Sequence, residues 1–329
     1  MTDDKNDDET GGLSRRQIVG GIAVAAGSGS AASMARAEAA VGEDVGIPKD
    51  MPISASAFER SYPRGQGFNA INENIFETVI GDPTYLEVWC YTDKISYAPG
   101  EKVLFHVSTT AQTFSVSIFR DGAQPMCVHQ AYELRGQFTG IKDDFYVKGC
   151  DWPIAYEWRL PRGLKTGFYM VILAAEGPNG QKREYEHGFF VRNESRKKAD
   201  ILLVAATSTW TAYNDWGGYS HYVSASETAS FASRLTHHKR PWAKGFIWTP
   251  NNAPRKPHDV PPPPGGIPRY PCLEFAISMG YSRWYSNAGW PTYERPFVVW
   301  AEENGFELDY ATQVDLHYNP QLLNDYKCV

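Results

Sequence analysis

The sequence predicts a β + α/β protein, in which an immunoglobulin-like β-sandwich over residues 85–192 precedes a three-layer α/β domain over residues 201–329. Three observations predict this division. Short segments with alternating apolar side chains, separated by turn residues, fill the first range. A polar stretch, residues 193–200, then has the composition of a linker. Beyond it, strand-like and helix-like segments alternate, which is typical of a parallel sheet with helices.

The expected sandwich is preceded by residues 38–84, an irregular lead-in without sustained periodicity. The predicted strands of the sandwich are 86–91, 103–108, 114–120, 158–161, 167–173 and 186–191. Asp121-Gly122 is the strongest turn signal between them. His106, His129 and His187 stand singly on strand-like segments, so we expect structural rather than ligand roles for them.

The expected α/β domain opens with the apolar run 201–206, a strand covered on both faces. A helix follows from Tyr293, with Thr292 as its N-cap and Asn304-Gly305 at its end. Residues 307–312 are predicted as a strand and 320–326 as a short helix. Residues 327–329 would open a further strand.

The N-terminal 37 residues have the features of a twin-arginine export signal. Arg15 and Arg16 precede a Gly/Ala-rich apolar stretch, and Ala35 and Ala37 form an A-x-A cleavage site. The apolar run 18–26 is far shorter than the ~20 residues that span a bilayer, so we expect no membrane anchor. The sequence thus predicts an exported protein, periplasmic or secreted. A net charge of −6 without a basic stripe argues against nucleic-acid binding.

No C-x-x-C pair occurs among the five cysteines, which argues against a zinc knuckle. An oxidising destination permits a Cys127–Cys150 disulfide, and two free thiols are equally compatible with the sequence. The proline-rich stretch 249–271 precludes regular structure; it is either a wall near a site or a peripheral loop.

The most informative segment is 207–222, directly after the first buried strand of the α/β domain. It packs tryptophans, tyrosines, a histidine, an aspartate and a Gly pair into sixteen residues. Ligands of open α/β sheets bind beyond the carboxyl ends of strands, so this segment is a candidate binding site. The alternative is an aromatic structural cap. His237-His238 is a weak metal pair, since adjacent side chains diverge in a regular element, and we expect Asp315 and His317 to make structural hydrogen bonds.

Residues 210–222, together with 294–312 and 314–317, resemble the large (beta) subunit family of N,N-dimethylformamidase. The resemblance implies a sandwich followed by an α/β domain related to class I glutamine amidotransferases. It also implies hydrolysis of a small formamide to formate and an amine at a mononuclear ferric site, held by two tyrosines and a glutamate. Fe(III) is a hard Lewis acid that suits phenolate and carboxylate oxygens. By motif, Tyr213 matches the first family tyrosine and is the predicted catalytic residue and metal ligand.

The other two ligands depart from the family pattern. The second family tyrosine stands in an Arg-Pro-Tyr context, which here aligns with residues 255–258, so either His258 replaces it or Tyr270 serves after a shift. The family glutamate lies in a His-x-Glu-Tyr motif after the next strand, and this sequence ends before it. We therefore expect a truncated α/β domain that a second chain would complete.

Two functions remain open on the sequence. One is an exported, iron-dependent hydrolase of small linear amides, incomplete by itself. The other is a non-catalytic exported protein that binds a ligand or a partner through a degenerate α/β domain.

Overall fold

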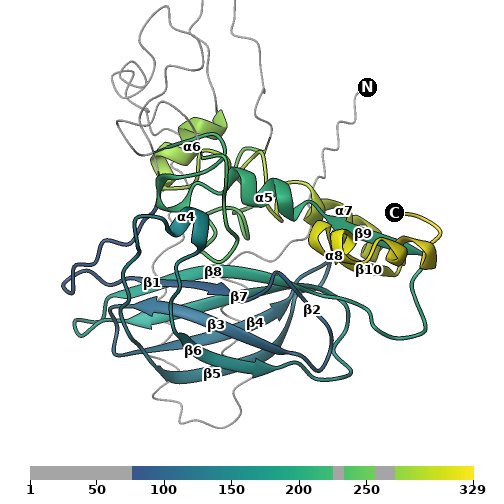
Figure 1. Cartoon of the computed structure of the whole chain (residues 1–329), viewed down its shortest axis with the longest axis horizontal. Coiled ribbons are helices and arrows are strands. Elements are labelled where there is room, and N and C mark those ends of the chain that lie inside the picture. Colours follow the sequence, from purple (N-terminus) through teal and green to yellow (C-terminus); the bar gives the residue numbers. More distant parts are fainter. Residues whose placement is uncertain (1–75, 225–232, 256–270) are drawn as a thin grey trace, which may run out of the picture.

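The computed structural model describes residues 76–224, 233–255 and 271–329. In these ranges the chain forms a β-sandwich with a smaller mixed part packed on one of its sheets (Figure 1). The sandwich strands are β1 (Val88–Thr92), β2 (Ser96–Tyr97), β3 (Lys102–Thr109), β4 (Thr113–Arg120), β5 (Met126–Arg135), β6 (Ile154–Arg159), β7 (Gly167–Glu176) and β8 (Lys182–Val191). A short helix, α4 (Phe145–Lys148), connects β5 to β6.

Two sheets make up the sandwich. One has the order β1-β3-β6 and the other β2-β8-β7-β4-β5. All pairings are antiparallel except that of β2 with β8. In β3 the side chains of Val103, Phe105 and Val107 are buried while those between them are half-exposed, as expected of a strand with one face on the core. The predicted sandwich is therefore confirmed.

A hydrogen bond from β7 to the residues just before it supports the immunoglobulin-like character of the sandwich. The Tyr169 hydroxyl donates to the carbonyl of Lys165, four residues upstream. A tyrosine that binds backbone shortly before its own strand is a hallmark of immunoglobulin-type sandwiches.

The sequence did not indicate all of the strands. The longest one missed is β5, which forms an edge of the five-stranded sheet and has mostly half-buried or exposed side chains. Because no face of β5 is continuously apolar, its sequence lacks the alternation that marks the other strands.

The three single histidines have structural partners, as predicted. His106 Nδ1 lies 2.7 Å from the Trp152 carbonyl oxygen. The rings of His129 and Trp158 stack with centroids 4.7 Å apart. His187 is buried, with Nε2 2.9 Å from the Thr92 hydroxyl, and burial lowers its pKa to about 3.

The C-terminal part contains β9 (Ile201–Ala205), α5 (Thr207–Tyr213), the 3-10 turn η2 (Trp216–Gly218), α6 (Pro271–Met279), α7 (Glu294–Glu303), β10 (Leu308–Thr312), α8 (Gln313–Tyr318) and the 3-10 turn η3 (Pro320–Asp325). β9 and β10 pair in parallel, as predicted. A parallel bridge between Ile201 and Cys328 adds a contact on the other edge of β9. Asn304 and Gly305 end α7 as expected, but the helix begins at Glu294 without a Thr292 cap, because the Thr292 hydroxyl donates to the Tyr285 carbonyl instead.

The expected three-layer domain of the class I glutamine amidotransferase type is not supported. In the described ranges its sheet consists of two paired strands and one bridge. β10 also packs against β7 and β8 of the sandwich, where a three-layer domain would place a layer of helices. One face of the β9–β10 sheet is therefore covered by the sandwich, where we had expected a layer of helices.

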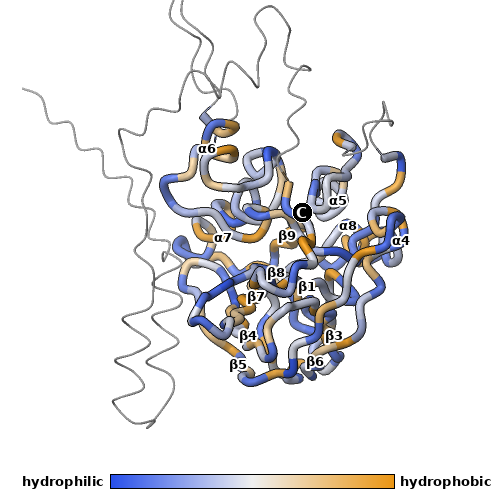
Figure 2. The backbone as a smooth tube through the Cα atoms, turned by 90° about the vertical axis from the view of Figure 1, so that its left-hand side faces the viewer, coloured by the Kyte–Doolittle hydropathy of each residue, from blue (hydrophilic) through white to orange (hydrophobic). Residues whose placement is uncertain are grey.

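The two parts share one hydrophobic core. β7 and the second half of β8 are buried almost continuously, which in an antiparallel sheet means that both faces are covered. The ring of Trp290 stacks on that of Phe168 of β7, with ring centroids 4.3 Å apart. The ring centroids of Trp210 and Phe190 of β8 are 5.8 Å apart. Apolar stretches, orange in Figure 2, accordingly recur at β7 and β9, where the parts meet.

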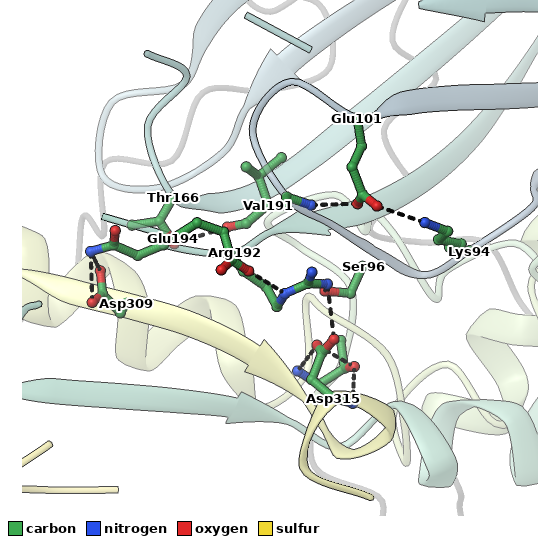
Figure 3. A network of polar contacts seen from close by, with 12 residues as sticks. Lys94, Ser96, Glu101, Thr166, Val191, Arg192, Glu194, Asp309 and Asp315 are labelled. Atoms are coloured by element: carbon green, nitrogen blue, oxygen red, sulfur yellow. Dashed lines mark hydrogen bonds and ion pairs between the residues drawn. The ribbon is translucent and has the colours of Figure 1, made fainter. Parts of the chain in front are cut away.

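Polar contacts join the same parts near residue 192 (Figure 3). The Arg192 guanidinium donates to Ser96 at 2.9 Å and to Asp315 of α8 at 3.0 Å. Asn193 donates to both carboxylate oxygens of Asp309, at 3.0 and 2.9 Å. Arg192 and Asn193, where the predicted linker begins, are thus hydrogen-bonded to α8 and β10, respectively.

All five cysteines are free. Of the two alternatives for Cys127 and Cys150, the structure therefore shows two free thiols and not a disulfide. Cys127 lies on the edge strand β5, whereas the Cys150 backbone is bonded to Lys239. In the ranges that the structure describes, no helix is long and apolar enough to cross a membrane. The predicted signal, with Arg15 and Arg16, lies outside those ranges, as does most of the proline-rich stretch.

Candidate functional site

The candidate site is built around α5, which follows β9 directly and ends at Tyr213. The sequence suggested a loop here, but residues 207–213 form a helix with no side-chain cap of its own. The first residues of two other helices supply the missing acceptors. Glu294 of α7 accepts from the Ala206 amide at 3.1 Å, and Gln313 of α8 accepts from the Ser208 amide at 3.0 Å. Because these acceptors come from outside the segment, its own sequence did not indicate the helix.

Tyr213 lies in a cluster of aromatic rings at the end of α5. Its ring stacks on that of Tyr222 with centroids 4.4 Å apart and meets Trp284 edge-on at 5.2 Å. Tyr222 and Trp284 are themselves 5.6 Å apart. Tyr213 is half-buried, whereas Tyr222 is 53% exposed, so the cluster opens to solvent on the Tyr222 side.

Phenol groups are the dominant polar groups of this cluster. Burial raises the pKa of Tyr213, and a hydrogen bond with Tyr222 and the negative charges that Tyr222 and Tyr293 would carry when ionised raise it further. Two other tyrosines therefore act on Tyr213. A phenolate at Tyr213 would require a cation nearby.

Arg240 holds the turn that follows α5. It is fully buried and donates to the carbonyls of Asn214 at 2.6 Å and of Trp216 and Tyr219 at 2.8 Å. Burial lowers its pKa to about 10, so the guanidinium stays charged at neutral pH. These bonds fix residues 214–219, which bring Tyr222 back onto Tyr213.

Asp215 is a buried carboxyl in the same turn. Neither of its oxygens has a well-formed hydrogen bond in the described ranges. Burial raises its pKa to about 6, against the lowering influence of the neighbouring Ser282 hydroxyl and of Arg283 and Arg240. The Ser282 hydroxyl also accepts a hydrogen bond from the Trp284 amide at 3.1 Å. Asp215 therefore lies next to the turn that carries Trp284.

The aromatic residues of segment 207–222 lie in two different surroundings. Trp210 and Trp216 are structural: Trp210 packs on Trp242, and Trp216 lies 5.6 Å from both Trp89 and Phe145. The tyrosines at positions 213 and 222 instead lie toward solvent. The tryptophans thus form the cap and the tyrosines form the candidate site.

The other candidates lie apart from this cluster. His237 and His238 were expected to diverge, but their rings stack at 4.9 Å because the segment is irregular. Asp315 forms a capping box with Thr312 and pairs with Arg192, which confirms its structural role. His317 is exposed, against Tyr318.

His258 and Tyr270 lie outside the described residues. Among residues 76–224, 233–255 and 271–329, no group of three His, Cys, Asp or Glu side chains could hold a metal ion. Phenols are not such groups, and Tyr222 and Tyr293 are the site residues that sequence reasoning missed. Tyr222 could have been found, since it belongs to the same aromatic segment as Tyr213.

A groove of about 1190 Å³ runs between the sandwich and the amino ends of β9 and β10. It is lined by charged residues of both signs, among them Arg162, Lys165, Lys197 and Glu307. None of the clustered tyrosines lines it, so the site and the groove are separate features.

Comparison with known proteins adds one informative match. The model of a family described as N,N-dimethylformamidase beta subunit-like, C-terminal, matches residues 116–329. No curated protein matches the chain. Matching solved structures include murine CRIg (11% identity, TM-score 0.24, covering 33% of this chain and 99% of that one). They also include the soluble domain of PmoD from Methylocystis sp. ATCC 49242 (Rockwell) (10% identity, TM-score 0.21, 36% and 98%).

Proposed function

The chain belongs to the N,N-dimethylformamidase beta subunit-like family, and from this premise we propose that it is an exported, iron-dependent hydrolase of small linear amides. The bond broken would be a non-peptide C–N bond, with water as the second reactant. Export by the twin-arginine route to the periplasm or medium is part of the proposal and rests on Arg15 and Arg16.

The observation that carries the proposal is the contact of the Tyr213 and Tyr222 phenols, with Tyr293 near enough to oppose ionisation of Tyr213. Because the Tyr222 and Tyr293 phenols raise the pKa of Tyr213, a phenolate at Tyr213 calls for a highly charged cation beside it. Phenolate oxygens are the hard donors that Fe(III) prefers. The residues present therefore fit a ferric ion, which would supply Lewis acidity toward an amide carbonyl and a bound water.

The chain's own residues would prepare the substrate position. The ring of Trp284 covers one side of Tyr213 and offers an apolar wall for the methyl groups of a small amide. The Arg240-bound turn keeps Tyr222 in place without a reorganisation step. His258 or Tyr270 remains the proposed second family ligand.

The test begins with the purified protein lacking residues 1–37. We expect about one iron per chain, a phenolate-to-iron charge-transfer band, and release of formate from N,N-dimethylformamide. Tyr213→Phe should abolish the band and most of the bound iron, and Tyr222→Phe should weaken both. Tyr318→Phe is the matched control, because Tyr318 is 82% exposed and outside the cluster.

A metal-free, inert protein would contradict the proposal and favour the alternative of a non-catalytic binding protein. A band that persists in Tyr213→Phe would remove Tyr213 from the site.

A further inference from the structure

The groove between the sandwich and the amino ends of β9 and β10 is lined by charged groups that separate segments of the chain supply. Arg162 and Lys165 come from the connection between β6 and β7, and Lys197 comes from the predicted linker. Glu303 and Glu307 come from the end of α7 and from the residues just before β10. None of these side chains has an ion-pair partner in the described ranges, so each is available to a ligand.

The remaining charges of the groove are already bound within the protein. Arg120, at 7% exposure, pairs with Glu302 at 2.7 Å. Arg192 pairs with Asp315 at 3.0 Å. Three further charged lining residues also have protein partners: Glu194, Lys198 and Asp309. A ligand in the groove therefore meets a free set of three cations and two carboxylates.

A row of exposed aromatic rings on α7 reaches the groove. Phe306 lines the groove and is 46% exposed, and its ring stacks on that of Trp300 with centroids 5.6 Å apart. Trp300 is 52% exposed, and its ring centroid lies 5.9 Å from that of Phe297. No lysine or arginine of the described residues lies over any of these rings. Exposed aromatic faces with carboxylates nearby suit an organic ammonium ion, which the ring quadrupole attracts.

We propose that the groove binds a small zwitterion of the phosphocholine type, in which a methylated ammonium and a phosphate or carboxylate lie a few bonds apart. The ammonium group would lie against the rings of Phe306 and Trp300, and the two free carboxylates of the groove would balance its charge. The anionic group would bind the three free cations, among which the guanidinium of Arg162 can donate two parallel hydrogen bonds to it. No clustered tyrosine lines the groove, so the inference does not depend on the proposed function.

The mixture of charges favours this ligand over simpler ones. A simple anion would be attracted by the free cations and repelled by the free carboxylates of the same groove, and a simple cation would meet the reverse. An anionic membrane surface would likewise be opposed by Glu303 and Glu307. A molecule with both charges uses every free group. The groove volume of about 1190 Å³ also admits such a zwitterion when it is attached to a glycerol.

The test is isothermal titration calorimetry of the purified full chain, without added metal, with phosphocholine as the probe. Choline and inorganic phosphate are titrated separately. We expect phosphocholine to bind with a dissociation constant at least about tenfold lower than that of either, because it combines both sets of contacts. Phosphocholine that does not bind, or binds no more tightly than choline and phosphate alone, would overturn the proposal.

Variants should separate the two sets of contacts. Trp300→Leu and Phe306→Leu should weaken the binding of phosphocholine and choline about fivefold or more, without weakening that of phosphate. Arg162→Met combined with Lys165→Met should weaken the binding of phosphocholine and phosphate, without weakening that of choline. Equal losses for all three probes in both sets of variants would contradict the proposed placement of the ligand and overturn the proposal.

The matched controls are Tyr132→Leu and Arg135→Met, which remove an exposed ring and an exposed cation of β5 that do not line the groove. Neither should change any of the three affinities, and a control that weakens phosphocholine binding as much as the groove variants do would overturn the proposal. Thermal unfolding confirms that each variant folds. If Phe306→Leu does not fold, Trp300→Leu decides by the same titrations.

Sedimentation with phosphatidylcholine vesicles distinguishes the two sources of this chemistry. Cosedimentation that free phosphocholine abolishes would support the proposal with a lipid headgroup as the ligand, and calorimetric binding without cosedimentation would support it with a free zwitterion. A dimeric wild type that becomes monomeric in Trp300→Leu would assign the exposed rings to a second copy of this chain and overturn the proposal. Because no metal is added, these results are independent of iron binding and amide hydrolysis at the Tyr213 cluster.

Discussion

Asp215 shows how one side chain couples the site to stability. Its pKa is about 6 in the folded chain, raised by burial from an ordinary value of 3.8. A carboxyl with a raised folded pKa keeps its proton in the folded state while the unfolded state gives it up. Its contribution is therefore present below about pH 3.8 and is lost as the pH rises through 6.

Asp215→Asn should remove this loss, because the amide is neutral at every pH and has nearly the same shape. Relative to wild type, the variant's free energy of unfolding should gain about 2–3 kcal/mol between pH 4 and pH 7, from 1.36 kcal/mol per unit of pKa shift. Urea denaturation at both pH values measures the difference. A difference that is the same at the two pH values would show that Asp215 titrates normally.

Individual site residues were predictable only where the sequence places them in a recognisable segment. Tyr213 followed from its motif, and Tyr222 belongs to the same segment. Tyr293, which raises the pKa of Tyr213, was not predictable, because it lies in a distant segment of the sequence and belongs to no motif shared with Tyr213. The role of Arg240 was not predictable either, because a single arginine in an irregular segment does not indicate that it will donate to buried backbone carbonyls.

Among the structural elements, η2 depends on a glycine. Gly217 has φ of 76°, in the left-handed region, and a Cβ there would lie 2.2 Å from the Phe145 ring of α4. Both the backbone conformation and the available space therefore exclude a side chain. Through this contact η2 and α4 support the turn that returns Tyr222 to Tyr213.

Gly217→Ala should destabilise the protein by about 2–4 kcal/mol, from strained backbone and overpacking together. Gly163→Ala is the matched control, since no heavy atom lies within 4 Å of its Cβ position, and it should stay within about 0.5 kcal/mol of wild type. Thermal or urea unfolding of the two variants measures both values. Equal stabilities would mean that α4 moves freely away from η2.

Element types were predicted well where the apolar pattern of the element itself marks it, and poorly where its support comes from elsewhere in the chain. β3, β4, β7 and β10 formed near their expected bounds because their own apolar patterns specify them. α5 was missed because its caps are Glu294 and Gln313. The layer arrangement was wrong because the amphipathic pattern of a strand shows that it is covered, but not whether a helix or another sheet covers it.

At the scale of the molecule, the junction between the two parts is closed by Asp121. The sequence predicted Asp121-Gly122 only as a turn, and the turn does follow β4. The Asp121 carboxylate, however, accepts from Trp290 Nε1 at 2.6 Å and from Arg295 Nε at 2.8 Å. Arg120 next to it pairs with Glu302 at 2.7 Å. A continuous apolar core and two partly buried ion pairs therefore link the sandwich to α7.

This junction predicts that the described parts unfold as one cooperative unit. Hydrogen exchange in increasing denaturant should expose amides of β7 and α7 at the same denaturant concentration.

Asp121→Ala leaves Arg295 and Trp290 Nε1 without their acceptor and should lower the free energy of unfolding by about 3–5 kcal/mol. In this variant α7 should open at lower denaturant than β7, because the lost bonds hold only the C-terminal part to the sandwich. Lys142→Ala is the control: its ion pair with Asp151 is exposed to solvent and should contribute little to stability, leaving the transitions coincident. If β7 and α7 still open together in Asp121→Ala, the shared apolar core alone accounts for the cooperativity.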